Sequence, residues 1–67
     1  MEVHYDEQVD AAYIQLSSKQ PQGAIEIDEG IIVHLTEANE IVSIEILEAS
    51  HRFPLNNLFT LKVATAS

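Results

Sequence analysis

The chain has 67 residues, no cysteine, and a formal net charge of −8 from 11 acids against three Lys and Arg residues. A chain of this length buries only about 60% of its unfolded surface, so small domains usually need a disulfide, a metal or a partner subunit. The lack of cysteine excludes disulfides and thiolate metal sites, and it fits a reducing compartment. We therefore expect one domain over residues 1–67, with a homodimer completing its core.

The acidity narrows the class of partner. Lys19, Arg52 and Lys62 cannot form a basic face, so direct binding of nucleic acid or of an anionic membrane is not expected. A basic protein or a cation is favoured electrostatically, and the alternative is that the charge only keeps a small domain soluble. Residues 1–10 lack a secretory signal, and no apolar run reaches the roughly 20 residues that span a bilayer. A soluble, cytoplasmic protein is predicted.

The first part of the chain predicts two strands. Val3 and Tyr5 begin a first strand, and turn-forming residues 6–10 follow. Residues 12–16 then alternate with the period of two that is typical of a strand. A helix over residues 7–16 is the alternative, since Glu, Gln and Ala favour helices, but the alternation favours the strand.

The middle of the chain predicts three more extended segments. A loop over residues 17–23 precedes the alternating residues 24–28, and Gly30 suits the turn that follows because it takes a positive φ without steric cost. Residues 31–36 and 41–47 are rich in β-branched and apolar residues, and Asn39 is the natural left-handed residue between them.

These segments predict a mainly β (α+β) fold, an antiparallel meander of about four strands near residues 3–47 with a short C-terminal helical element. One face should be apolar and built from Ile14, Leu16, Ile25, Ile27, Val42, Ile44 and Ile46. Residues 48–52 can form one helical turn before Pro54. The leucine spacing favours a helix near residues 55–60, the alternation of residues 59–63 suggests a strand instead, and residues 64–67 are expected to be a flexible tail.

No catalytic, cofactor or metal site is predicted, and we expect that the protein is not an enzyme. The three histidines (His4, His34 and His51) have no local ligand spacing, so a metal site would need distant segments to converge. The acidic clusters lack the pattern of a calcium loop, and a solvated face is the simpler interpretation. The candidate nucleophiles are Ser17, Ser18, Ser43 and Ser50, none of them in a nucleophile elbow.

Tyr5 and Tyr13 have two interpretations. Tyrosine is enriched at interaction hot spots, and the alternative, which we prefer, is that each covers the edge of the sheet.

Several motifs resemble a known family. Tyr5-Asp6, Asp10-Ala11 and residues 13–16 are similar to the opening Tyr-Asp…Asp-Ala-x-Tyr-Ile-x-Leu of a family of small bacterial proteins named a domain of unknown function (number 2283). Residues 31–35 match its hydrophobic strand, and residues 44–50 resemble its Gly-Ile-Glu-Ile-Leu-x-Ala-Ser signature. The resemblance covers residues 3–52 and implies a small β-rich fold in a bacterial cytoplasm, with no established activity.

The chain departs from that family at two positions. Asn39 stands where the family usually has a turn glycine, and it can adopt the same left-handed conformation. Ser43 stands where the family has glycine before Ile-Glu-Ile, so its hydroxyl argues against a close approach of backbone there.

Three functions remain open, in decreasing order of preference. The first is an acidic protein-interaction module, an antitoxin-like partner of a basic protein, which the resemblance suggests for some members. The second is a homo-oligomeric structural domain without catalytic activity. The third is an enzyme or metal protein that uses His4, His34 and nearby acids.

Overall fold

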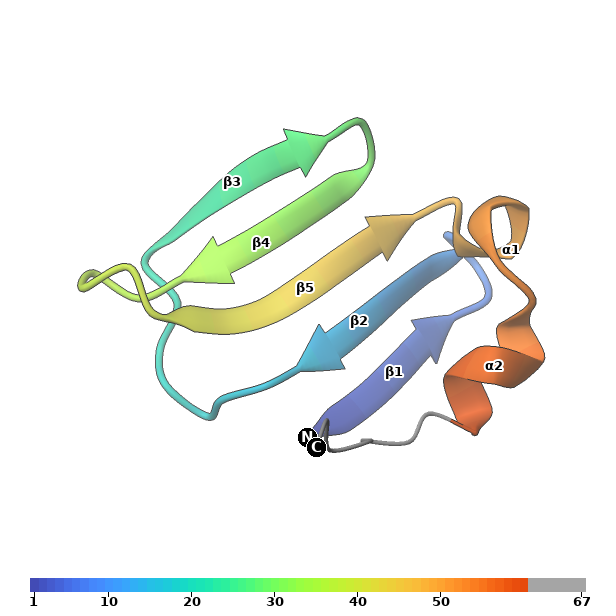
Figure 1. Cartoon of the computed structure of the whole chain (residues 1–67), viewed down its shortest axis with the longest axis horizontal. Coiled ribbons are helices and arrows are strands. Elements are labelled where there is room, and N and C mark those ends of the chain that lie inside the picture. Colours follow the sequence, from blue (N-terminus) through green and yellow to red (C-terminus); the bar gives the residue numbers. More distant parts are fainter. Residues whose placement is uncertain (61–67) are drawn as a thin grey trace, which may run out of the picture.

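The computed structural model describes residues 1–60, which form one antiparallel sheet and two short helices (Figure 1). The elements are β1 (Glu2–Asp6), β2 (Ala11–Gln15), β3 (Gly23–Asp28), β4 (Ile31–Leu35), β5 (Ile41–Leu47), α1 (Ala49–Arg52) and α2 (Leu55–Phe59). The predicted mainly β fold with a C-terminal helical element is confirmed, with five strands in place of about four. The helix considered over residues 7–16 is wrong, because β2 occupies that segment.

The two helices agree with the sequence pattern. Pro54 separates them, since Phe53 before it is extended, with φ −160° and ψ 160°. α2 confirms the helix predicted near residues 55–60. The strand considered over residues 59–63 lies mostly outside the described residues, and Phe59 belongs to α2. The tail expected at residues 64–67 lies wholly outside them. Neither α1 nor α2 is long and apolar enough to span a membrane.

The strand order is β1-β2-β5-β4-β3, with every neighbouring pair antiparallel. The predicted meander therefore holds for β1-β2 and for β3-β4-β5, but it is wrong between β2 and β3, which are not neighbours. The connection of residues 16–22 is longer than the tight turns that join adjacent strands. It lets β3 lie at the far edge of the sheet, and β5 returns to fill the gap beside β2.

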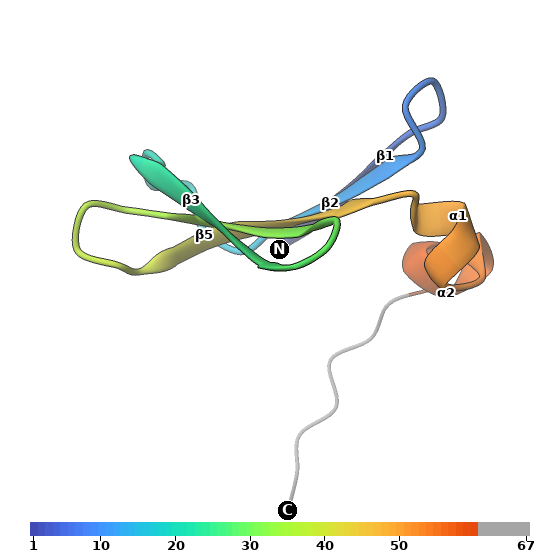
Figure 2. The same cartoon turned by 90° about the horizontal axis from the view of Figure 1, so that it is seen from above.

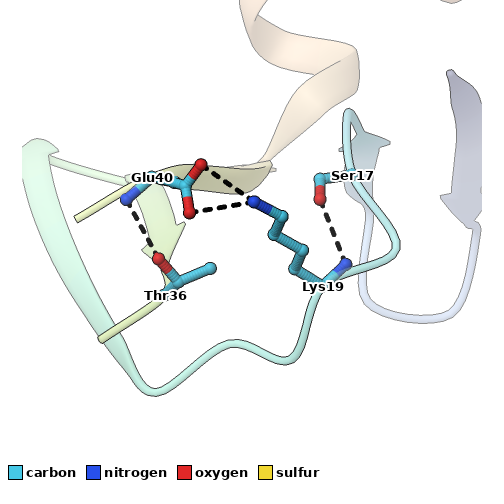
Figure 3. Close-up of polar contacts among 4 residues, drawn as sticks. All are labelled: Ser17, Lys19, Thr36 and Glu40. Atoms are coloured by element: carbon cyan, nitrogen blue, oxygen red, sulfur yellow. Dashed lines mark hydrogen bonds and ion pairs between the residues drawn. The ribbon is translucent and has the colours of Figure 1, made fainter. Parts of the chain in front are cut away.

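This long connection is tied to the turn between β4 and β5 (Figure 3). Lys19 Nζ donates to both carboxylate oxygens of Glu40 at 2.9 Å. Ser17 Oγ accepts from the backbone N–H of Lys19 at 3.0 Å, and Thr36 Oγ1 accepts from that of Glu40 at 3.1 Å. These contacts hold the residues that leave β2 against the residues that enter β5.

The register gives the sheet two different faces. A row of apolar side chains crosses all five strands on one face, the apolar face: Val3, Ile14, Ile44, Val33 and Ile25. The adjoining row on the other face, the polar face, contains His4, Tyr13, Glu45, Ile32 and Glu26. The predicted division into an apolar and a polar face is thus confirmed. Ile27 is the exception, because it lies at a register shift between Glu26 and Asp28.

The helices cover only one end of the apolar face. Figure 2 shows α1 and α2 at one end of the sheet and on one side of it. The helices join the sheet through a buried cluster of Ala12, Ala49 and Leu58. Five partly buried residues pack against this cluster: Val3, Tyr5, Ile46, Phe53 and Leu55. Farther along the face, Ile25 is 53% exposed and Leu16 is 46% exposed.

Four of the residues 1–60 have a left-handed backbone. Asn39 (φ 65°) and Gly30 (φ 77°) confirm the predicted turns. Asp10 and Glu48, both at φ 52°, were not predicted. They lie side by side at the same end of the β2–β5 pair, where the chain enters β2 and leaves β5, so they direct the β1–β2 turn and α1 toward one another.

Candidate interaction surfaces

A network of hydrogen-bonded side chains lies at the centre of the polar face. Ser43 Oγ donates to the Tyr13 hydroxyl at 2.7 Å, and the two residues come from the adjacent strands β5 and β2. The rings of His4 and His34 lie on either side of Tyr13, with ring centroids 6.4 and 6.0 Å from its own. His34 Nε2 is 3.2 Å from Glu45 Oε1. The tyrosine is therefore fixed by neighbours on three other strands.

Ser43 precedes Ile44-Glu45-Ile46 on β5, and its hydroxyl has a defined role. It is fully buried, although its hydroxyl lies on the polar face. Its bond to Tyr13 satisfies that hydroxyl, as buried polar groups require. A glycine at this position would leave Tyr13 without this partner, so the serine adds order to the polar face.

The charge on the polar face is negative. Glu2, Glu26 and Glu45 project from it, on β1, β3 and β5. None of the five strands contains Lys or Arg. Arg52 lies on α1 and donates to the backbone carbonyls of Leu47, at 3.0 Å, and Glu29. The face thus offers carboxylates with aromatic and imidazole rings between them.

A second cluster surrounds Asp10 at the turn between β1 and β2. Its carboxylate accepts from the Tyr5 hydroxyl and from Ser50 Oγ, both at 2.7 Å, and from the Ser50 backbone N–H at 3.1 Å. Its backbone carbonyl accepts from the N–H of Ala49 at 2.9 Å. Asp10 therefore joins the β1–β2 turn to the start of α1, which explains why the motifs place Tyr, Asp, Ala and Ser at these positions.

The Asp10 cluster shifts two pKa values in opposite directions. The hydrogen bond to Asp10 is the main cause that raises the pKa of Tyr5 to about 12. Hydrogen bonds from Ser50 and then from Tyr5 lower the pKa of Asp10. Both shifts favour the protonation states that make the cluster, a neutral phenol and an ionised carboxylate. The cluster is structural, since Ser50 donates to Asp10 rather than to an imidazole that could act as a base.

The structure separates the histidines considered for a metal site. His4 and His34 lie on the polar face, whereas His51 is on α1. Within residues 1–60, no group of three or more His, Asp or Glu side chains is placed to hold a metal ion. Tyr5 lies on the edge strand β1 and packs against the cluster under the helices, whereas Tyr13 lies on β2, inside the sheet. The edge interpretation thus fits the strand of Tyr5 but not that of Tyr13.

Sequence reasoning missed the roles of Ser43 and Asp10. Their partners lie 30 and 40 residues away in the chain. Alternation in β2 and β5 was the only signal in the sequence, and it places Ser43 and Tyr13 on one face only once the pairing of these two strands is known.

Comparisons with known proteins identify one relative and a family. A Methanosarcina mazei protein named "Putative hypoxanthine phosphoribosyltransferase" is 41% identical over 51 residues, which cover 76% of this chain. The chain spans only 41% of the length of that relative. No solved structure matches. The family model described as "Protein of unknown function (DUF2283)" matches residues 2–50, as the motifs suggested, and the chain belongs to this family.

Proposed function

We propose that the domain is an acidic protein-interaction module that binds a basic protein with its polar face, as an antitoxin-like partner would. The observation that carries this proposal is Tyr13, held by Ser43 on a face that bears glutamates. Tyrosine is enriched among residues that dominate binding energy, and a side chain already fixed loses little entropy on binding. Glu45, beside Tyr13 on β5, can pair with an arginine of the partner.

The charge of the chain supports the same class of partner. A net charge of −8 attracts a basic protein over a distance and raises the rate of encounter. The same carboxylates repel phosphates, so nucleic acids and anionic membranes do not enter the proposal. This repulsion also disfavours the phosphoribosyl chemistry named for the relative, and we propose a module without catalytic activity. The setting that we propose is the bacterial cytoplasm.

The length of the relative supports a module. The aligned part makes up 41% of that protein, so the domain is joined there to further sequence. A domain that recurs with other sequence can recruit a partner to its neighbour without catalysing a reaction.

Affinity capture with matched variants tests the proposal. The polar-face variant replaces three strand glutamates by glutamine: Glu2→Gln, Glu26→Gln and Glu45→Gln. The control variant removes the same number of negative charges from turn residues instead, with Glu7→Gln, Glu29→Gln and Glu37→Gln, all at exposed positions. Wild type and control should retain a basic protein from the native host that the polar-face variant loses, and binding of the purified partner should weaken as salt increases.

Two results would contradict the proposal. One is equal retention by the polar-face variant and the turn variant, which would mean that net charge rather than the face determines binding. The other is recovery of the wild-type domain without any basic protein. Calorimetric titration of the purified pair supplies the affinities for the first comparison.

A further inference from the structure

The apolar face continues beyond the part that the helices cover. Tyr5, Ala12 and Ile46 belong to the cluster with α1 and α2 or pack against it. The apolar row runs on from Ile44 through Val33 to Ile25, on β5, β4 and β3. We define the open apolar face as Leu16, Ile25, Val33 and Ile44. In the part of the chain that the structure describes, Leu16 and Ile25 are 46% and 53% exposed and supply most of its surface, Ile44 is half-buried, and Val33 is only 9% exposed.

We propose that a second copy of this chain covers the open apolar face, so that two sheets pack face to face. The distribution of charge favours this occupant. The open apolar face contains no charged residue. On that side of β3, β4 and β5 the register places one carboxylate, Asp28, which lies at the end of β3 beside the turn, whereas Glu26 and Glu45 project from the polar face of the same strands. Two chains of net charge −8 can therefore join these faces while those carboxylates stay in water. A basic partner would find no counter-charge there.

The thickness of the helix layer on the apolar face also favours a second sheet as the occupant. α1 and α2 pack against the apolar face and end partway across it. A helix is about 10 Å in diameter, and packed sheets lie about 10 Å apart. The helices thus occupy the layer in which a second sheet would lie, and they leave the area over β5, β4 and β3 for it. A two-fold axis would place the same three strands of the second copy there, with its helices at the opposite border.

The size of this area sets the expected strength of the dimer. Three strands about 4.8 Å apart and about 20 Å long cover on the order of 300 Å² in projection, and more in accessible surface. A standard interface buries about 800 Å² per partner. We therefore expect a reversible dimer whose population depends on concentration in the micromolar range, rather than a permanent one.

Sedimentation equilibrium of the full chain from about 5 to 500 µM tests the proposal. The apparent mass should rise from 7.5 kDa toward twice that value. Added salt should strengthen association, because it screens the repulsion between two acidic chains. Ile25→Glu places a carboxylate in the open apolar face and should weaken dimerisation by at least about tenfold. The variant monomer should still fold, since Ile25 is already more than half exposed.

Ala24→Glu is the matched control. Ala24 is exposed on the same strand, and it pairs with His34 on the polar face, so this variant adds the same charge on the other side of the sheet. It should dimerise like the wild type, and circular dichroism checks that both variants are folded. A single 7.5 kDa species at every concentration would overturn the proposal. So would a dimer that persists in Ile25→Glu, or one that Ala24→Glu weakens equally.

The salt dependence separates this proposal from binding of a basic protein. Association through the open apolar face strengthens with salt and is not weakened by the three glutamine substitutions on the polar face, which reduce the repulsion between the two chains. Binding of a basic protein weakens with salt and is lost in that variant. Failure of either interaction therefore leaves the test of the other intact.

Discussion

The two faces of the sheet use the same strands but carry different kinds of contact. On the polar face, side chains of adjacent strands hydrogen-bond, as Ser43 does to Tyr13 and His34 to Glu45. On the apolar face, packing provides the contacts, and the buried cluster with the helices contains only Ala12, Ala49 and Leu58. The polar face is thus ordered by the fold itself, whereas the apolar face depends on what covers it.

The largest effect should come from breaking the covered end of the apolar face. Leu58 is 4% exposed and is the largest side chain in the buried cluster, so Leu58→Ala removes much of the contact between α2 and the sheet. Such a truncation costs about 2–5 kcal/mol of unfolding free energy. Urea denaturation followed by circular dichroism should show this loss of unfolding free energy. A variant that is already unfolded without urea would mean that the loss equals or exceeds the stability of the wild type.

Phe59→Ala is the control for that change. Phe59 is the next residue of α2, is apolar and larger, and is 69% exposed. Its truncation should change the unfolding free energy by less than about 0.5 kcal/mol, the usual range for surface positions. Equal losses in the two variants would show that α2 does not pack on the sheet through Leu58.

The next prediction concerns the Asp10 cluster, which joins the covered end to the β1–β2 turn. Hydrogen bonds from Ser50 and Tyr5 lower the pKa of Asp10 below its ordinary value of about 3.9. The stability that they provide is present above that value and is lost as the pH falls below about 4. The pKa of Tyr5 is raised to about 12, so its contribution is present below about pH 10 and is lost between about 10 and 12.

Asp10→Asn should remove both of these dependences of stability on pH. The amide retains the shape but not the charge that strengthens these hydrogen bonds, so the variant should be less stable at neutral pH. Its denaturation midpoint should then vary less with pH, below 4 and above 10, than that of the wild type. Glu7→Gln, at an exposed position of the same turn, serves as the control for net charge. Parallel pH profiles for the wild type and Asp10→Asn would refute this account.

The sequence was sufficient to predict most of the elements but not their neighbours. Alternation with a period of two predicts β2 and β5, and the leucine spacing predicts α2. Alternation also divides the strands correctly between two faces, except at Ile27 of β3, where the register shifts. It does not determine which strands pair across the long connection of residues 16–22, and the pairing of β5 with β2 decides the order of the sheet.

The candidate site was less predictable for the same reason. Tyr13 was recognised as a possible hot spot, but the serine that fixes it lies 30 residues away. The sequence alone marks Ser43 only as a departure from the glycine of the family that the motifs resemble. The Asp10 cluster likewise joins segments 40 residues apart. The motifs that contain Asp10 and Ser50 can be recognised in the sequence, but the hydrogen bonds between them cannot.

A smaller effect should appear when the order of the polar face is broken. The hydrogen bond between Ser43 and Tyr13 should contribute about 0.5–1.5 kcal/mol, the range for a neutral pair. The double-mutant cycle of Ser43→Ala and Tyr13→Phe isolates this term from changes in packing. A coupling energy of zero would show that Ser43 does not hold the ring. A basic partner, once identified, should bind Ser43→Ala less tightly than the wild type, because the ring is then less ordered.

The smallest effect should come from the ion pair that joins the β2–β3 connection to the β4–β5 turn. Lys19 and Glu40 have side chains 58% and 56% exposed, so their contact should contribute only about 0.2–1 kcal/mol. Lys19→Met should remove that amount at low salt, and near 1 M salt the variant and the wild type should become equally stable because the charges are screened. Lys19→Arg keeps the charge and should behave as the wild type. A loss in Lys19→Met that persists at high salt would mean that the lysine holds residues 16–22 by packing rather than by charge, and that the position of β3 depends on that packing.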